Sequence, residues 1–89
     1  MSYDIRLTRE AEKMLDRLDR SAERRIRQRI VLLSENPLDP RVSAPLTERA
    51  GLRKSRVGGW RILFTVDLDH KIVFVLTVDT RGQVYKHSS

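Results

Sequence analysis

Apolar and polar residues alternate along this chain with two different periods, which divide it into a mainly helical part and a strand-rich part. Residues 3–7 alternate one by one, as in a half-buried strand. From residue 9 to residue 35, apolar side chains recur every three or four positions, which predicts two amphipathic helices. Their buried stripes are expected at Ala11, Met14, Leu15 and Leu18, and at Ala22, Ile26, Ile30 and Leu33.

Polar residues mark where these helices begin and end. Thr8 stands at the N-cap position of the first helix, which has two glutamates in its first turn. Ser21 is the expected N-cap of the second helix, which runs to about Glu35 and stops at Asn36-Pro37. Because the connection between the helices is so short, they should form an antiparallel hairpin.

The strand-rich part opens with a predicted β-hairpin. Gly58 and Gly59 separate two extended runs, residues 52–57 and 60–66. A two-residue turn of this composition is expected to have positive φ at both glycines. Trp60 alternates with three apolar residues of the second run, which favours a core position over a base-stacking platform.

The remaining segments complete an α+β fold. Residues 36–48 contain three prolines and form an irregular link, and residues 67–70 form a turn. A strand over 71–78 is expected to be buried on both faces, and a short strand over 81–85 closes the chain. The order β-α-α-β-β-β-β predicts an antiparallel-rich sheet with the N-terminal helical hairpin packed on one face. The whole chain, residues 1–89, is predicted to be a single domain.

Positive charge is concentrated in the strand-rich part. Residues 1–50 hold eleven Lys or Arg against nine Asp or Glu, whereas residues 51–89 hold seven against three. The total charge of +6 favours polyanionic partners, nucleic acid first and an acidic protein second. No apolar run approaches the roughly 20 residues of a membrane span, so no membrane partner is expected. With no cysteine and no visible signal peptide, a cytoplasmic location is expected.

The predicted hairpin gathers cations on one face. If Val57 pairs with Trp60 across the turn, Arg56 falls opposite Arg61, and Lys54 shares their face. Like charges directly opposed on a sheet repel each other. A bound anion would relieve that repulsion, so this face is the first candidate for a binding site.

The end of the chain adds groups that suit RNA cleavage. Arg81 and Tyr85 have the same parity and should share a strand face. RNA supplies its own nucleophile, the 2′-hydroxyl, so a protein need only align the backbone, stabilise charge on the phosphate and move two protons. Arginines can do the first two tasks, and Tyr85 can transfer a proton if nearby cations lower its pKa from about 10. The alternative interpretation of Tyr85 is an edge-strand aromatic packed on Trp60.

No metal site or cofactor site is predicted. The two histidines, His70 and His87, are far apart, and the chain has no Gly-rich phosphate loop or zinc-ligand spacing. Asp67, Asp69 and Asp79 fall at predicted strand ends, where turn and cap roles are usual.

Two motifs resemble the RelE/ParE superfamily of toxins from bacterial and archaeal toxin–antitoxin pairs. The segment Arg56-Val-Gly-Gly-Trp-Arg61-Ile-Leu-Phe resembles the family's arginine–valine–glycine–x–aromatic–arginine hairpin. The ending Thr80-Arg81-Gly-Gln-Val-Tyr85-Lys resembles its closing arginine and tyrosine. With the order of elements, the resemblance covers nearly the whole chain and implies a RelE-like fold.

The resemblance also implies an activity. Members of the RelE branch are endoribonucleases that cut messenger RNA in the ribosomal A site without a metal. By this resemblance, Arg61 grips the scissile phosphate, Arg81 stabilises the transition state and Tyr85 transfers a proton. Lys54 matches a family lysine that contacts the RNA and assists catalysis.

Further implied features are supporting contacts and partners. Arg53 and Arg56 are implied as RNA-binding residues. The implied partners are the 70S ribosome with its mRNA and a cognate antitoxin that silences the toxin, with no small-molecule cofactor. Two positions depart from the family pattern: Thr80 stands where many relatives have histidine, and Leu52 where some have a second lysine.

Two alternatives share the same fold. The first is a ParE-like inhibitor of DNA gyrase, which needs no catalytic residues of its own. The second is a weakly active or non-catalytic RNA-binding member, which the missing histidine favours.

Overall fold

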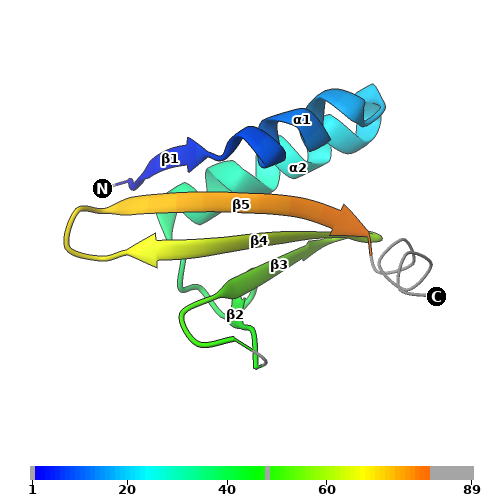
Figure 1. Ribbon diagram of the computed structural model, residues 1–89. Helices are drawn as coiled ribbons and strands as arrows, with labels where there is room; N and C mark the ends of the chain where they lie inside the picture. The colour runs from blue at the N-terminus through cyan, green and yellow to red at the C-terminus, as the bar shows by residue number, and fades with distance from the viewer. Residues whose placement is uncertain (1, 48, 81–89) are drawn as a thin grey trace.

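A short strand, two helices and four further strands follow one another in the computed structural model, which describes residues 2–47 and 49–80 (Figure 1). The elements are β1 (Asp4–Leu7), α1 (Arg9–Arg17), α2 (Arg20–Glu35), β2 (Ala44–Pro45), β3 (Arg53–Val57), β4 (Trp60–Asp67) and β5 (Ile72–Thr80). The predicted α+β order is confirmed as far as Thr80. The final strand expected over 81–85 lies outside the described residues. One short strand, β2, was not expected within the irregular link.

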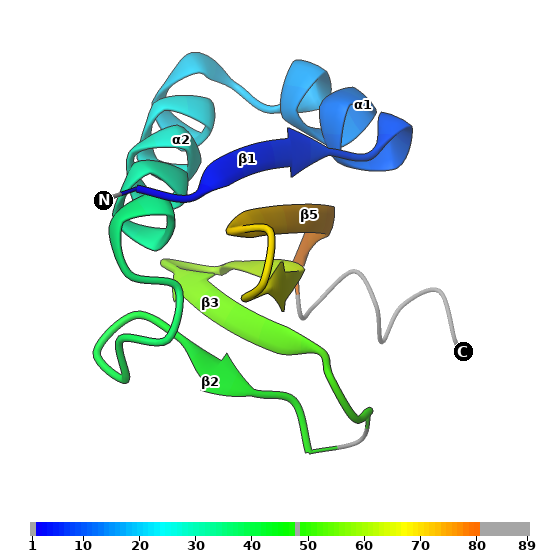
Figure 2. The same ribbon diagram turned by 90° about the vertical axis from the view of Figure 1, so that its left-hand side faces the viewer.

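The five strands form a single mixed sheet in the order β1-β5-β4-β3-β2. β1 pairs in parallel with β5, and the other neighbouring strands are antiparallel. Figure 2 shows α2 lying along one side of this sheet, while no helix of the described residues covers the other side. We call that uncovered side the open face. The predicted helical hairpin on one sheet face is therefore confirmed.

Side-chain caps fix the start of both helices. The Thr8 hydroxyl accepts a hydrogen bond from the Ala11 N–H at 3.1 Å and donates one to the Leu76 carbonyl of β5 at 2.6 Å. α2 begins two residues earlier than predicted, because the Asp19 carboxylate, and not Ser21, accepts from the Ala22 N–H at 2.7 Å. The prediction of a Ser21 cap was wrong. Aspartate is as good an N-cap as serine, and here it comes first along the chain.

The core lies between the helices and the covered face of the sheet. The apolar stripes predicted for the helices are confirmed, with Ala11, Leu15, Ala22, Ile26, Ile30 and Leu33 all buried. All of these except Ala22 belong to one core cluster with Ile62 and Phe64 of β4 and three valines of β5, and Trp60 packs against this cluster as expected.

The interpretation of β5 as buried on both faces was wrong. Only Val73, Val75 and Val78 of this strand are buried, and they all belong to the core cluster. The three-residue step from Val75 to Val78 reflects a bulge, because Leu63 pairs with Thr77 while Phe64 pairs with Val75. This bulge changes the parity of β5 and determines which of its later side chains lie on the open face.

The turn between β3 and β4 follows the predicted register but not the predicted backbone. Val57 pairs with Trp60 and Arg56 with Arg61, as expected. Of the two glycines, Gly58 has a φ of 60°, whereas Gly59 does not have a positive φ. A hairpin turn with positive φ at its first central residue alone is of the type II′ kind. None of the described helices is long and apolar enough to cross a membrane.

Candidate functional site

Charged residues line up across the open face of three neighbouring strands. Arg56 of β3 pairs with Arg61 of β4, which in turn pairs with Asp79 of β5. Lys54 precedes Arg56 by two residues in β3 and pairs with Leu63, so its side chain lies on the same face as the two arginines. The register predicted for Lys54, Arg56 and Arg61 is therefore confirmed. We call these three residues the cation row.

Asp79 is the functional neighbour that sequence reasoning missed. Its Oδ1 lies 3.3 Å from the Arg61 Nε, and both side chains are 24% exposed. The expected cap or turn role for Asp79 was wrong, since this residue lies within β5, which runs further than the predicted strand. The pair reduces the repulsion between Arg56 and Arg61 that the sequence suggested.

The contact with Asp79 uses one edge of the Arg61 guanidinium. Only Nε is engaged, and within residues 2–47 and 49–80 neither Nη group of Arg61 makes a hydrogen bond. An arginine held through Nε still has donors with which to bind a phosphate oxygen. On the open face, the Arg61 guanidinium is therefore oriented by Asp79, and its Nη groups make no hydrogen bond to the described residues.

The free edge of β3 has a pocket of about 190 Å³. β2 pairs only with Arg53 and Lys54, so it leaves the Arg56 carbonyl at the edge of the sheet. Arg29 of α2 covers that edge, where its Nη1 donates to the Arg56 carbonyl at 2.6 Å and to the Ser55 hydroxyl at 3.0 Å. We call this hollow the edge pocket; it is lined by Arg29, Pro40, Arg41, Val42, Ser43, Ala44, Lys54 and Arg56.

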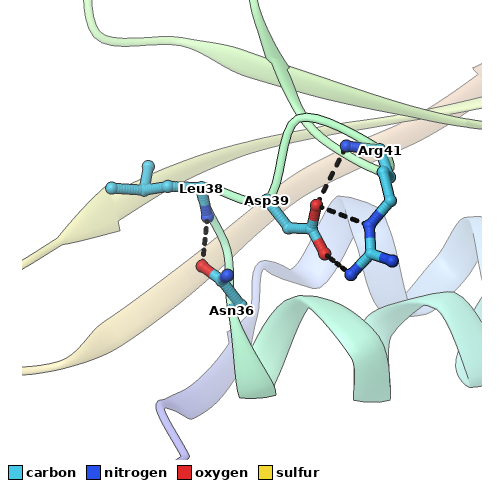
Figure 3. Close-up of polar contacts among 4 residues, drawn as sticks. All are labelled: Asn36, Leu38, Asp39 and Arg41. Atoms are coloured by element: carbon cyan, nitrogen blue, oxygen red, sulfur yellow. Dashed lines mark hydrogen bonds and ion pairs between the residues drawn. The ribbon is translucent and has the colours of Figure 1, made fainter.

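Arg41 reaches the edge pocket from a turn after α2. Figure 3 shows the Asp39 carboxylate accepting hydrogen bonds from both the guanidinium and the backbone N–H of Arg41. These hydrogen bonds hold the pKa of Asp39 below its ordinary value, and the guanidinium contributes more than the N–H. The same turn is closed by Asn36, whose side-chain oxygen accepts from the Leu38 N–H at 3.3 Å.

Arg53 does not join the cation row. It pairs with Phe64, so its side chain lies on the covered face, and its Nε donates to the buried Ser43 hydroxyl at 2.7 Å. Arg81 and Tyr85, the other candidate residues, lie outside the described residues. The structure therefore brings together Lys54, Arg56 and Arg61 and separates Arg53 from them.

Other charged groups are engaged elsewhere. Asp67 accepts hydrogen bonds from the N–H and the ring of His70 in the turn before β5, which confirms its turn role. Arg27 on the exposed side of α2 forms an ion pair with Glu23 at 2.9 Å. In the described part of the chain, no three His, Cys, Asp or Glu residues come together as a metal site would require.

Known proteins are similar to this chain in both sequence and fold. A family model described as the ParE toxin of the type II toxin–antitoxin system parDE matches residues 5–85. The chain is 36% identical over 92 residues to the toxin RelG of Mycobacterium tuberculosis, with 97% of this chain and 99% of that protein covered.

Solved structures agree with this match. The RelBE2 toxin–antitoxin complex of Mycobacterium tuberculosis contains a chain with 32% identity and a TM-score of 0.77, covering 91% of this chain and 100% of that one. The isolated RelE toxin of E. coli, at 21% identity, has the same fold with a TM-score of 0.78 over 98% of this chain and 95% of its own. The chain belongs to the RelE/ParE superfamily and is a toxin of a type II toxin–antitoxin system.

Proposed function

We propose that this toxin is a ribosome-dependent mRNA endoribonuclease that cuts in the ribosomal A site and so inhibits translation in the cytoplasm. The observation that carries the proposal is the cation row: Lys54, Arg56 and Arg61 lie together on a sheet face that no described helix covers. A row of cations on an accessible surface is suited to the phosphates of an RNA backbone.

The chemistry assigned to the site uses the RNA as its own nucleophile. The 2′-hydroxyl gives up its proton and attacks the adjacent phosphate, and the 5′-oxygen of the next nucleotide leaves and takes up a proton, which yields a 2′,3′-cyclic phosphate and a 5′-hydroxyl. Arg61 binds the scissile phosphate through its Nη groups, which have no hydrogen-bond partner among the described residues, and Lys54 and Arg56 bind the neighbouring charge. In this mechanism no metal or cofactor is needed, because neither the nucleophile nor the charge stabilisation has to come from one.

Two residues outside the described part complete the proposed site. Arg81 stabilises the charge that develops on the phosphate, and Tyr85 transfers a proton. A proton-transfer group typically contributes roughly 10²–10⁴-fold to a rate. Arg81 follows directly after Thr80, the last residue of β5, two positions along the chain from the Asp79 that pairs with Arg61.

A cognate antitoxin is the proposed inhibitory partner. The solved relatives include toxin–antitoxin complexes, and the +6 charge of this chain suits a partner with an acidic segment. A segment that orders as it binds could cover the open face and exclude RNA.

The test is primer extension on a defined mRNA incubated with the toxin, with and without purified 70S ribosomes. The proposal expects new 5′ ends within the A-site codon when ribosomes are present and far fewer without them. Intact message in both reactions would reject the proposal.

The match to a ParE family model favours a second candidate, inhibition of DNA gyrase. A protein-binding surface has no requirement for cations arranged around one phosphate, so the cation row favours the nuclease. A supercoiling assay separates the two: loss of gyrase activity at stoichiometric toxin, with mRNA left intact, would establish the gyrase inhibitor.

A further inference from the structure

The edge pocket concentrates positive charge from three separate parts of the chain. Arg29 comes from α2, Arg41 from the turn after it, and Lys54 and Arg56 from β3. One carboxylate, that of Asp39, contacts Arg41. Four cations and no carboxylate line this pocket of about 190 Å³, so its lining is strongly positive even though Asp39 offsets the charge of Arg41 from outside it.

Most of that charge has no internal counterion. Arg29 donates to neutral acceptors, the Ser55 hydroxyl and the Arg56 carbonyl. Across residues 2–47 and 49–80, the side chains of Lys54 and Arg56 form no ion pair. Uncompensated like charges held close together favour the binding of an anion, which lowers their mutual repulsion.

The size of the pocket limits what that anion can be. Pockets for whole small-molecule ligands usually measure roughly 300–1,000 Å³, so about 190 Å³ suits a single charged group of a larger ligand. Lys54 and Arg56 belong both to the pocket and to the cation row, and Arg56 faces Arg61. A strand whose scissile phosphate lies at Arg61 therefore meets the pocket along a continuous positive path around the edge of β3.

We propose that the edge pocket is a second phosphate site, which holds a backbone phosphate of the RNA other than the one at Arg61. The choice of RNA as the occupant rests on the proposed function. Arg29 and Arg41 distinguish this site from the cation row, because they line the pocket but do not belong to the sheet, and of the two only Arg29 also donates hydrogen bonds to β3. With one phosphate held at Arg61 and a second in the edge pocket, the RNA is fixed on both sides of Arg56. The distance between the two sites then determines which phosphodiester bond lies at Arg61.

The first experiment measures binding without cleavage. Its probe is a short fluorescent uridine strand with every 2′-oxygen methylated, titrated by anisotropy at several KCl concentrations. Arg41→Ala is compared with Arg27→Ala, a matched control. Each arginine pairs with one carboxylate at about 3 Å and is well exposed, 87% for Arg41 and 53% for Arg27, but only Arg41 lines the edge pocket.

The proposal expects an effect of Arg41→Ala alone. Its affinity should fall about fivefold, and the slope of log K against log salt should lessen by about 0.7, the value for one phosphate contact of a single strand. Arg41→Lys should recover most of the affinity, and Arg27→Ala should behave as the parent protein. Equal losses in the two alanine variants, or no binding by the parent protein, would overturn the proposal.

A second measurement locates the contact directly. In NMR titrations with the same strand, the backbone N–H signals of Ser43 and Ala44 should shift in the parent protein and much less in Arg41→Ala. Poly-glutamate at equal charge should displace the strand poorly, and displacement as strong as by unlabelled RNA would contradict a phosphate site. Because the probe is never cut, binding as expected by a protein that fails to cleave mRNA would refute the nuclease and leave this site standing.

Discussion

Arg61 and Asp79 face each other across the paired strands β4 and β5, with 3.3 Å between the Arg61 Nε and the Asp79 Oδ1. The pair orients an arginine that would otherwise be repelled by Arg56 on its other side. It leaves both Nη groups of Arg61 without a partner in the described part of the structure. In the proposed mechanism, Asp79 therefore orients Arg61 and leaves its Nη groups to bind the phosphate.

Removal of the Asp79 carboxylate should slow cleavage more than it weakens binding. Asp79→Ala is expected to lower kcat about tenfold, the effect of about 1.4 kcal/mol, with KM nearly unchanged. Asp79→Asn keeps an oxygen that can accept from the Arg61 Nε, so its kcat should lie between that of Asp79→Ala and that of the parent protein. The measurement is the rate of A-site cleavage over a range of concentrations of ribosome-bound mRNA, which gives kcat and KM separately.

A double-mutant cycle separates this positioning role from a general loss of structure. Arg61→Ala with Asp79→Ala should be no slower than Arg61→Ala alone, because Asp79 acts through Arg61. If the two losses multiply, or if Asp79→Ala cuts faster than the parent protein, Asp79 does not position Arg61.

Arg29 should stabilise the fold as well as line the edge pocket. Replacement by methionine removes the donor to the Arg56 carbonyl and to the buried Ser55 hydroxyl. We expect a loss of about 1–3 kcal/mol in the free energy of unfolding, measured in urea. Arg27→Met, which breaks only an exposed ion pair, should cost less than about 1 kcal/mol. Equal losses would show that Arg29 does not cap the sheet edge.

The two glycines of the hairpin turn should differ in their tolerance of a side chain. Gly58 has a φ of 60°, and a Cβ there would lie 2.5 Å from the Arg25 Nη2, whereas a Cβ on Gly59 meets nothing within 4 Å. Gly58→Ala should destabilise the protein by about 1–2 kcal/mol through the left-handed backbone, since Arg25 can move aside. Gly59→Ala should change stability by less than about 0.5 kcal/mol. The comparison uses thermal unfolding, and a reversed order would contradict the turn geometry.

The Asp39–Arg41 turn predicts a pH effect of defined sign. The lowered pKa of Asp39 means that its contribution to stability is complete above the unfolded pKa and is lost as the pH falls through the folded one. In Arg41→Ala the Asp39 pKa should rise toward its ordinary value of 3.8, but not reach it, because the N–H of residue 41 still donates. Carboxyl NMR titration measures both values. An unchanged pKa in the variant would show that the guanidinium does not act on Asp39.

Much of this structure could be predicted from local patterns in the sequence. The paired glycines set the register of β3 and β4, and so brought Lys54, Arg56 and Arg61 to one face. The helical stripes identified the buried residues of α1 and α2, because their period is a property of the segment itself.

Features that depend on contacts between distant segments could not be predicted from the sequence, because no local pattern marks them. The bulge in β5 alters its parity without any glycine or proline to mark it, which hid the pairing of Asp79 with Arg61. The reach of Arg29 to β3 and the parallel pairing of β1 with β5 join segments far apart in the chain. Arg53 was named as an RNA-binding residue through the family resemblance alone, and its place on the covered face, where its Nε donates to the Ser43 hydroxyl, agrees with the strand alternation that had left it out of the cation row.

Single-turnover cleavage of ribosome-bound mRNA by Arg61→Ala tests the central claim most directly, with Arg27→Ala as the control for lost charge. If Arg61 binds the scissile phosphate, the rate should fall at least about a hundredfold in Arg61→Ala and less than about twofold in the control. Parent-like cleavage by a folded Arg61→Ala protein would contradict the account.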